Sequence, residues 1–521
     1  MKKRYKLLIG IVVFIGLLWL ALELFAGSFI RSSLQRSVQY YPSDTLAIGQ
    51  VNVTYFPLGL ELRDLDFDLH QPADTLMISW RGKLEVARAK GLNWLGALQG
   101  KDLRLELLEV GEGAIQWNIS PRQKQKKRQD PSSSGKPERH KLLLEKLRIE
   151  QLDLGLERDS SSIGLSVALE IDSLWLNNKD SLRWQLGRLR MHSENGDFRN
   201  VMRDYNFSYQ SLHFDSADSV LNMRGFRMKP GLSRSGFYEK YTYMKVQPDI
   251  SADLIQMEGI DVARVNEGIF ARVLLIDSTL IDIYQDTRKE RRPGRVKLPS
   301  ELLAKAPLAI DVDSLVLKRG KLIYHERVDK QEELAFLEGD ELELSIFPLS
   351  NRGDTVSSDM DMKASIRFMK EAKTTLNAHF YKGKPSHDFK VEATMGAVNM
   401  ARFNPILLPM TGIYIKSGDC REIRVSMYGN DYTCKGDMNI AYHDLKIAIP
   451  ANDEERNFFE KIAEGLGNLA LVNTNNDFSD DNGLIYYERD LRRPVVNYWW
   501  KSMETGLKDV LIRFHKNKDG S

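Results

Sequence analysis

One stretch of the chain decides its fold: IDVDSLVLKRGKLIY, which runs from Ile310 to Tyr324. Apolar residues recur along it at alternate positions, with charged residues between them. Because successive side chains of a β-strand point to opposite faces, this period of two gives one apolar face and one solvated face. No catalytic residue recurs with this pattern. What the pattern repeats along the chain is therefore a surface with one apolar face and not an active site.

The same pattern recurs along the chain. Residues Leu103 to Trp117 (LRLELLEVGEGAIQW) match the stretch without gaps, and looser copies run from Leu144 to Leu156 and from Ala271 to Ile283. Each copy is interpreted as a strand, a tight turn and a second strand. Such faces could close on each other in an ordinary antiparallel sandwich, or one of them could stay open in an extended sheet.

The alternation continues over most of the chain. It predicts roughly 20 strands, whereas a usual sheet has about 5 to 6. A serial array of this length favours an extended sheet or a solenoid over a compact domain. Within Leu58 to Leu69 (LGLELRDLDFDL), a change of phase at Asp64 predicts a β-bulge.

Composition and motifs exclude several classes of function. Lysine and arginine number 74 against 72 aspartate and glutamate residues, so the net charge of +2 gives no global attraction to nucleic acid. The two cysteines, Cys420 and Cys434, lack the spacing of a zinc or redox site. No zinc-protease, serine-hydrolase or P-loop motif occurs. We therefore expect no enzyme activity, no catalytic residue, no cofactor, no metal site and no nucleic-acid partner.

The N-terminus predicts a membrane anchor. Leu7 to Ala26, LLIGIVVFIGLLWLALELFA, supplies about the 20 apolar residues that cross a bilayer as a helix. Basic residues precede it in greater number than they follow it, so the N-terminus should be cytoplasmic and the bulk of the chain outside. A cleaved signal peptide is the alternative, but the apolar run exceeds a usual signal peptide core. The expected anchor residues are Leu7, Phe14, Leu17, Trp19 and Leu22.

Two polar inserts and a helical end interrupt the strand pattern. Residues 120–141 are basic and poor in aromatic residues, which predicts a disordered loop, and residues 285–298 form a second basic insert. Helices are predicted from Asp453 to Leu471 and from Pro494 onward. The second helix has an apolar stripe that could pack over the open end of the sheet or contact a membrane surface.

The cysteines are predicted not to form a disulfide. A turn at Tyr428 to Asp431 would place Cys420 opposite about Asn439 and Cys434 opposite about Val425. Directly paired cysteines would instead need a turn in the middle of an apolar stripe. With the turn at Tyr428 to Asp431, the two cysteines lie several positions apart along the strands. This is too far for a disulfide, whose Cα atoms lie within about 7 Å of each other.

Three stretches resemble a known family. They are Pro299 to Glu326 (PSELLAKAPLAIDVDSLVLKRGKLIYHE), Asn404 to Ile449, and Tyr486 to Leu507 (YYERDLRRPVVNYWWKSMETGL). They are similar to the AsmA-like family of envelope proteins in its Bacteroidetes-type form. The resemblance implies an inner-membrane anchor and a periplasmic sheet curled into a groove with an apolar interior, as in repeating β-groove, bridge-like lipid transfer proteins. It also implies a role in phospholipid transport toward the outer membrane and in envelope maintenance.

The sequence therefore predicts a mainly β protein. One N-terminal transmembrane helix should precede an extended, curled antiparallel β-sheet (β-groove) with C-terminal amphipathic helices. We expect an inner-membrane, single-pass protein with a periplasmic bulk that binds or conducts membrane phospholipids for outer-membrane lipid homeostasis. The alternative is a periplasmic scaffold or assembly factor for outer-membrane proteins, with envelope proteins as partners.

The predicted segments and lipid-contacting residues follow from this arrangement. The segments are 1–30 (cytoplasmic N-terminus and transmembrane helix), 31–119 (β-meander), 120–141 (basic loop), 142–284 (β-groove repeats), 285–298 (basic insert), 299–450 (β-groove repeats with the family-like closing segment) and 451–521 (helical region). The candidate groove residues are Ile163, Leu165, Val167, Leu169, Leu315, Leu317, Leu322, Tyr324, Leu342, Leu344 and Ile346.

Overall fold

The structure is a computed structural model of the 521-residue chain. It describes residues 30–35, 43–55, 58–73, 76–93, 103–121, 141–177, 183–202, 204–328, 333–352, 359–381, 386–411, 414–448, 471–477 and 482–518. The predicted anchor, most of the first basic loop and the first C-terminal helix lie outside these ranges. None of the helices within these ranges is both long and apolar enough to cross a membrane.

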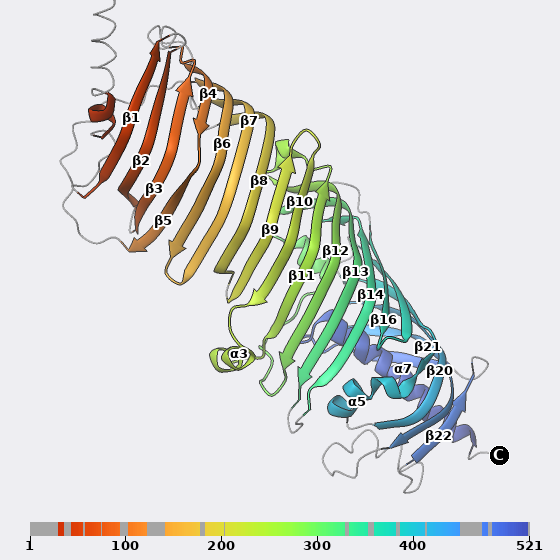
Figure 1. Ribbon diagram of the computed structural model, residues 1–521. Helices are drawn as coiled ribbons and strands as arrows, with labels where there is room; N and C mark the ends of the chain where they lie inside the picture. Colours follow the sequence, from red (N-terminus) through yellow and green to blue (C-terminus); the bar gives the residue numbers. More distant parts are fainter. Residues whose placement is uncertain are drawn as a thin grey trace, which may run out of the picture. The chain divides into compact units, whose positions relative to one another are not determined.

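The chain is mainly β and divides into two compact units, Met1–Asp218 and Ser219–Ser521. The strands of unit 1 are β1 (Thr45–Tyr55), β2 (Leu58–Ala73), β3 (Leu76–Lys90), β4 (Leu103–Val110), β5 (Gly113–Pro121), β6 (Lys141–Arg158), β7 (Ser161–Asn177), β8 (Arg183–Met202) and β9 (Tyr205–Asp215). They lie side by side in chain order, except that β4 and β5 follow one another between β3 and β6 (Figure 1).

Unit 2 contains the other described strands and most of the described helices. Its strands are β10 (Val220–Pro230), β11 (Val246–Glu258), β12 (Gly268–Asp286), β13 (Ala309–Arg327), β14 (Ala335–Phe347), β15 (Leu349–Ser350), β16 (Met360–Phe368), β17 (Ala372–Phe380), β18 (Phe389–Met395), β19 (Val398–Asn399), β20 (Tyr414–Gly429), β21 (Thr433–Ala448), β22 (Leu471–Asn476) and β23 (Gly483–Glu488). Its helices are α3 (Arg234–Lys240), η1 (Val262–Arg264), α4 (Pro299–Ala304), η2 (Met400–Phe403), α5 (Asn404–Thr411) and α7 (Val495–Lys518).

Three of the four repeated stretches form single strands, and the fourth, Leu103 to Trp117, is divided between β4 and β5. The stretch Ile310 to Tyr324 lies within β13, Leu144 to Leu156 within β6 and Ala271 to Ile283 within β12, so the predicted tight turn inside each of these copies is wrong. In place of the turn, β13 has Arg319 in the left-handed region, with φ 50°. One left-handed residue shifts the alternation of side chains by one position without reversing the chain.

This phase shift recurs in other strands. In β21, Asp444 has φ 53°, and Tyr442 and Leu445, which flank it, pack in the same buried cluster. In β2, Asp64 has φ 52°, so the predicted change of phase is confirmed. A bulge is not formed there, because the pairing with β1 keeps one register on both sides of Asp64. Asp and Asn adopt the left-handed region more readily than most residues, since their short side chains can bond locally.

The strand pairing is mixed, so the predicted antiparallel arrangement is correct for most pairs of strands and wrong for three of the described pairings. Strand β6 runs parallel to β4 and β5, and β13 runs parallel to β12. Parallel neighbours need a crossover of a dozen or more residues. The two polar inserts, 120–141 and 285–298, lie in these two connections. The repeated stretches therefore become direct neighbours in equal phase, with Ile276 beside Leu317 for example.

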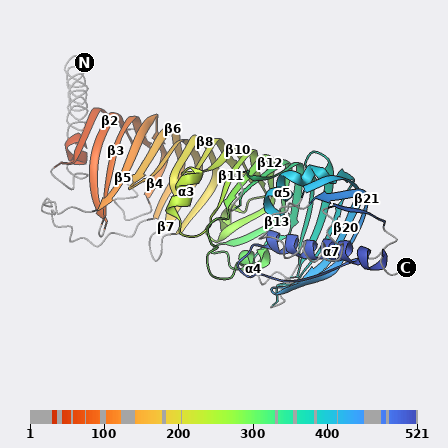
Figure 2. The ribbon, with the colours of Figure 1, turned by 90° about the horizontal axis from the view of Figure 1, so that it is seen from below.

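Helix α7 packs on the apolar face of the sheet in unit 2, alongside β20 and β21 (Figure 2). Trp499, Met503 and Leu507 join one buried cluster, and Val510 joins a second. Of the two alternatives for this helix, the structure favours packing on the sheet, but the helix lies on the apolar face and not merely over an open end of the sheet. Leu303 of α4 and Leu407 of α5 pack against the same clusters.

The two cysteines are free and buried, which confirms that they form no disulfide. Their predicted partners are wrong: Cys420 lies opposite Tyr442, and Cys434 lies opposite Gly429. Burial raises the pKa of the Cys420 thiol to about 11. That thiol is therefore a poor nucleophile at neutral pH.

The register differs because the β20–β21 turn lies further along the chain than predicted. The side-chain oxygen of Asn430 accepts hydrogen bonds from the backbone N–H groups of Tyr432 (2.8 Å) and Thr433 (3.0 Å). The backbone N–H of Asn430 also donates to the Thr433 carbonyl at 3.0 Å. A side chain that mimics the backbone in this way fixes the turn locally.

Candidate functional site

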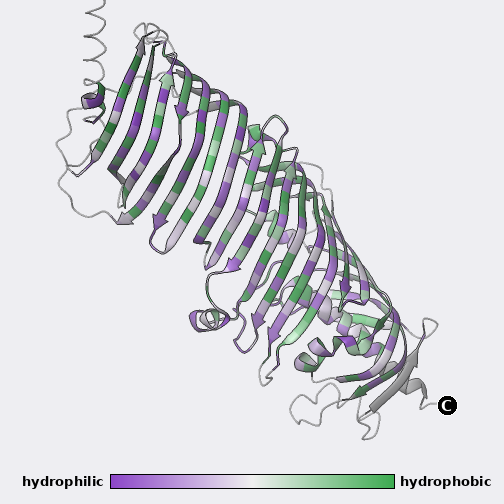
Figure 3. Ribbon diagram, in the orientation of Figure 1, coloured by the Kyte–Doolittle hydropathy of each residue, from purple (hydrophilic) through white to green (hydrophobic). Residues whose placement is uncertain are grey.

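Rows of apolar side chains cross the strands of unit 1 side by side. On β7, Leu169 lies beside Ile149 of β6 and Met191 of β8. Apolar and polar residues alternate along these strands (Figure 3). The complete row is Val51, Leu62, Ala87, Val110, Ile149, Leu169, Met191 and Phe214.

The predicted residues of β7 line this apolar face. Ile163, Leu165, Val167 and Leu169 occupy alternate positions and are all half-buried. Three of them lie beside leucines of β6: Ile163 beside Leu156, Leu165 beside Leu154, and Val167 beside Leu152. The structure thus places the four β7 candidates together on one face of the sheet.

In the described part of unit 1, no second layer covers this face. Every substantial contact between its elements joins strands that are neighbours in the sheet. Both clusters of buried apolar residues found among the described residues lie in unit 2. The apolar side chains of unit 1 are shielded mainly by one another, so they keep apolar surface that a ligand could remove from water.

The remaining candidates line strands of unit 2. Leu317 lies beside Leu344, and Leu315 lies beside Ile346. Leu317 is buried, and its neighbours are half-buried. The candidates on this part of the sheet are Leu315, Leu317, Leu322 and Tyr324 on β13, and Leu342, Leu344 and Ile346 on β14.

Tyr324 differs from the other candidates. Its hydroxyl donates to the carboxylate of Glu326, and burial raises the pKa of the phenol. Gln285 of β12 lies beside Glu326. The apolar strip of β13 therefore ends in polar groups at Tyr324, a feature that the alternation of apolar residues did not reveal.

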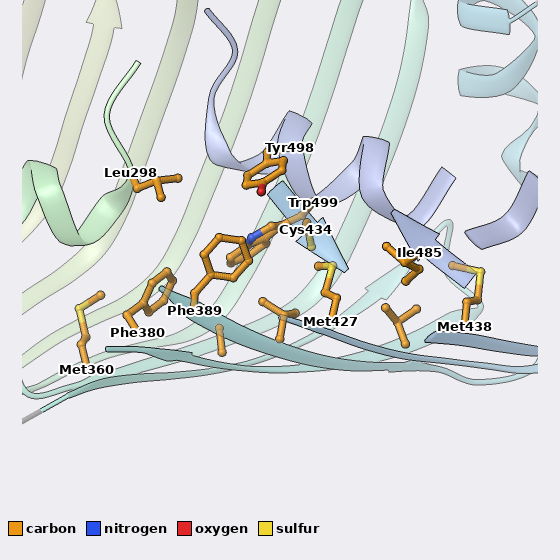
Figure 4. Packing of buried hydrophobic residues seen from close by; sticks show 13 residues of the cluster. Leu298, Met360, Phe380, Phe389, Met427, Cys434, Met438, Ile485, Tyr498 and Trp499 are labelled. Atoms are coloured by element: carbon orange, nitrogen blue, oxygen red, sulfur yellow. The ribbon is translucent and has the colours of Figure 1, made fainter. Parts of the chain in front are cut away.

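Helix α7 covers part of the apolar face of the sheet in unit 2. The ring of Phe389, which is fully buried, lies 5.7 Å from the ring of Tyr498 and 6.0 Å from that of Trp499 (Figure 4). Below the helix, Val391 and Met427 are also buried side chains of neighbouring strands. Here the apolar face is a core of the ordinary two-layer kind.

A cluster of charged residues, the charged clasp, ties α4 to the loops of β18 and β21. Arg295 Nη2 lies 2.6 Å from Asp431 and 3.0 Å from Glu301. Lys305 Nζ donates to Glu301 at 2.8 Å, and His387 Nδ1 lies 2.9 Å from Asp431. The two carboxylates are buried, with side chains 4% and 6% exposed. The sequence carried no signal for this cluster, because its members come from distant segments without a common motif.

Three members of the clasp could hold a metal by residue type alone. Ligand atoms of Glu301, His387 and Asp431 lie within 4.8 Å of one another. However, Arg295 Nη2 contacts both carboxylates, so its positive charge stands where a bridging metal ion would bind. Lys305 supplies a second cation. The cluster fits an ion-pair network, and we assign no metal to it.

Helical residues 30–35 shield the first strand of unit 1, which pairs with β2 alone among the described strands. Arg31 donates to the Gly49 carbonyl at 2.8 Å, and Gln35 donates to the Leu46 carbonyl at 2.8 Å. Backbone groups at a sheet edge invite another strand unless they are occupied. These side chains occupy two of them.

The edge of β23 is shielded in the same way by α7. The N–H of Leu484 donates to Asp509 at 2.7 Å, and the N–H of Tyr486 donates to Thr505 at 3.3 Å. Strand β23 pairs with β21 alone among the strands that the structure describes. Helix α7 thus both covers the apolar face and occupies a sheet edge.

Comparisons with models of known protein families and with curated protein sequences give no match for this chain.

Glu301→Gln is expected to lower the free energy of unfolding of unit 2 by about 1–3 kcal/mol at neutral pH. The hydrogen bond from Lys305 holds the pKa of the Glu301 carboxyl below its ordinary value of 4.5. A carboxyl with a lowered pKa stabilises the fold above its unfolded-state pKa, and this contribution is lost as the pH falls through the folded-state pKa. Denaturant titrations at several pH values should show a weaker loss of stability below pH 4.5 in the variant.

Glu258→Gln is the matched control for this prediction. Glu258 pairs with Arg272 at 3.1 Å, but the two side chains are 36% and 67% exposed. Removing an exposed pair should change the free energy of unfolding by less than about 1 kcal/mol. Equal losses for the two glutamines would contradict the buried character of the clasp.

Proposed function

We propose that this chain is an AsmA-like envelope protein that binds or conducts phospholipids, with acyl chains lying on the apolar faces of its sheets. Each methylene group removed from water would contribute about 0.8 kcal/mol, or roughly 25 cal/mol per Å² of apolar surface. Such binding needs no catalytic residue and no specific polar recognition of the chain. Movement along a row would exchange one set of apolar contacts for an equivalent set.

The observation that carries this proposal is the uncovered apolar face of unit 1. Its rows run in register across β1 to β9, and the substantial contacts between its described strands all join neighbours in the sheet. The described helical residues 30–35 bond to β1, the first strand of the unit. An apolar face of this length is uncommon on a soluble surface unless it binds something. A flexible acyl chain fits a long, unbranched row of apolar side chains better than a compact ligand does.

The location is part of the proposal. The apolar segment Leu7 to Ala26 and the basic residues before it support an inner-membrane anchor with a periplasmic bulk. This would place the apolar face of unit 1 outside the cytoplasm, where phospholipids pass toward the outer membrane.

The alternative function, a scaffold for outer-membrane proteins, would use sheet edges to bind client strands. The shielded edges weigh against it. Arg31 and Gln35 occupy carbonyl groups of β1, and Thr505 and Asp509 occupy N–H groups of β23. An incoming strand would have to displace these bonds before it could pair.

Photocrosslinking tests the proposal. The full-length chain is incubated with vesicles that contain a phospholipid with a photoreactive group on its acyl chain, and crosslinked residues are mapped by mass spectrometry. We expect crosslinks at Leu165, Val167 and Leu169 and few at Ser166 and Ala168, which alternate with them on β7. Crosslinks confined to the predicted anchor, or spread evenly over both faces, would refute lipid binding by the sheet.

A further inference from the structure

An apolar row that α7 covers continues across the sheet to residues that are only half-buried. Ile346 of β14 lies beside Met362, and the row continues through Ala378 and Val391 to Met427. Ile346 is half-buried at the margin of the cluster that α7 covers, whereas Ala378, Val391 and Met427 are only 3%, 0% and 2% exposed. The same apolar row therefore passes from half-buried residues at the margin of the cluster to fully buried residues beneath a helix.

Polar atoms without hydrogen-bond partners gather where α7 meets α4. The buried atoms are Asn497 Oδ1 and Trp499 Nε1 on α7, Ser300 Oγ on α4, and Arg489 Nε just before α7. A buried polar atom left unpaired costs about 1–3 kcal/mol. Such atoms are uncommon in native structures and require an explanation. Their concentration at one end of α7 lowers the free-energy cost of moving the helix away.

Movement of α7 away from the sheet would also expose backbone N–H groups that can form hydrogen bonds with water. The N–H groups of Leu484 and Tyr486, which now donate to Asp509 and Thr505, would bond to solvent instead. The main loss would be the apolar contact of the helix with the sheet. An acyl chain on the same row would restore that contact, since it offers the same kind of surface.

We propose that α7 is a displaceable lid on unit 2, and that phospholipid acyl chains reach the apolar row of β16 to β21 only when it leaves. The inference rests on the proposed function and adds a regulatory step to it. Helix and ligand would compete for one surface, so the amount of lipid bound there would depend on the fraction of molecules with the lid open.

A reversible crosslink between helix and sheet tests the lid. The Cys434 thiol of β21 lies in hydrogen-bond contact with the Ser502 hydroxyl of α7, and both side chains are fully buried. Ser502→Cys would place two sulfur atoms next to each other, so oxidation should join α7 to β21 by a disulfide. The same full-length molecule can then be compared before and after reduction.

The readout is the position of crosslinks from the photoreactive phospholipid. Oxidation should lower crosslinking at Met362 and Met427 at least about tenfold, because the open state is no longer populated, and reduction should restore it. Crosslinking at Leu169 of unit 1 should stay unchanged. Ser502→Cys combined with Cys434→Ser cannot form the bond, so it should show no effect of oxidation.

A second variant acts in the opposite direction. A Cβ atom added at Gly506 would lie 2.8 Å from Ile485 Cγ1 and 3.0 Å from Met438 Cβ. Gly506→Leu should therefore push α7 from the sheet and raise crosslinking at Met427. Equal crosslinking at Met427 in the oxidised and reduced Ser502→Cys protein would overturn the lid but leave lipid binding by unit 1 intact. Absence of crosslinks at both Leu169 and Met427 in every form would overturn the proposed function and the lid with it.

Discussion

Phe389→Ala is expected to lower the free energy of unfolding of unit 2 by about 3–5 kcal/mol, the usual cost of removing a buried aromatic side chain. Phe389 is 0% exposed, and its ring is surrounded by those of Phe380, Tyr498 and Trp499. Its loss would leave a cavity between the sheet and α7 that the surrounding rings could fill only in part. Hydrogen exchange of β18 to β21 in denaturant would measure the change.

The same substitution, valine to alanine, can be made on the covered face of unit 2 and on the open face of unit 1, and its cost in stability compared. Val391 is 0% exposed beneath α7, whereas Val167 is half-buried on the open face of unit 1. Val391→Ala should cost about 2 kcal/mol, and Val167→Ala should cost less than about 1 kcal/mol because no closed cavity forms. Equal costs would mean that the face of unit 1 is covered as well, contrary to its single-layer structure.

The alternation of apolar residues predicted the strands but not their bends. In the template stretch, a change of phase near Gly320 looks the same in sequence whether the chain reverses or one residue turns left-handed. The structure has the second arrangement, with φ 50° at Arg319. Glycine or asparagine would have signalled that conformation, whereas arginine did not, because it is an uncommon residue there.

The parallel pairings were predictable from features that the sequence contains. Each basic insert follows one copy of the repeated pattern and precedes the next, and a parallel neighbour needs a connection of that length. Two similar stretches in parallel place equivalent residues side by side, as with Ile276 and Leu317. Considered separately, each basic insert predicted only a loop and the repeat predicted only a series of strands. Parallel pairing follows only when the two are considered together.

The lipid-contacting candidates could be predicted from the spacing of residues within one strand. The region that α7 covers could not, because it is formed by contacts between residues far apart in the sequence. Leu165 and Leu169 share a face because of their spacing on one strand. The burial of Val391, by contrast, depends on Trp499 and Tyr498, which follow it by more than a hundred residues. The apolar stripe of α7 was visible in sequence, but the surface that it covers was not.

Leu169→Asp is expected to reduce lipid bound to unit 1 about tenfold or more while leaving the fold intact. A carboxylate in contact with an acyl chain loses part of its hydration, and burying a charge without a partner is far costlier than the loss of a few methylene contacts. Leu169 is half-buried in a single layer, so in the absence of lipid the new carboxylate can reach water. The full-length variant would be purified and its bound phospholipid measured by mass spectrometry and by acyl-chain photocrosslinking on β6 to β8.

Ala168→Asp carries the same charge one position away on the opposite face, beside His192 of β8. The two variants share the added charge and the strand, so these common factors cancel in the comparison and only the face differs. If lipid falls in Leu169→Asp and not in Ala168→Asp, the apolar face is where the acyl chain lies. Equal losses in both would point to damage to β7 itself, and full retention in both would mean that lipid binds elsewhere, so either result would contradict the assignment of this face as the lipid-binding surface.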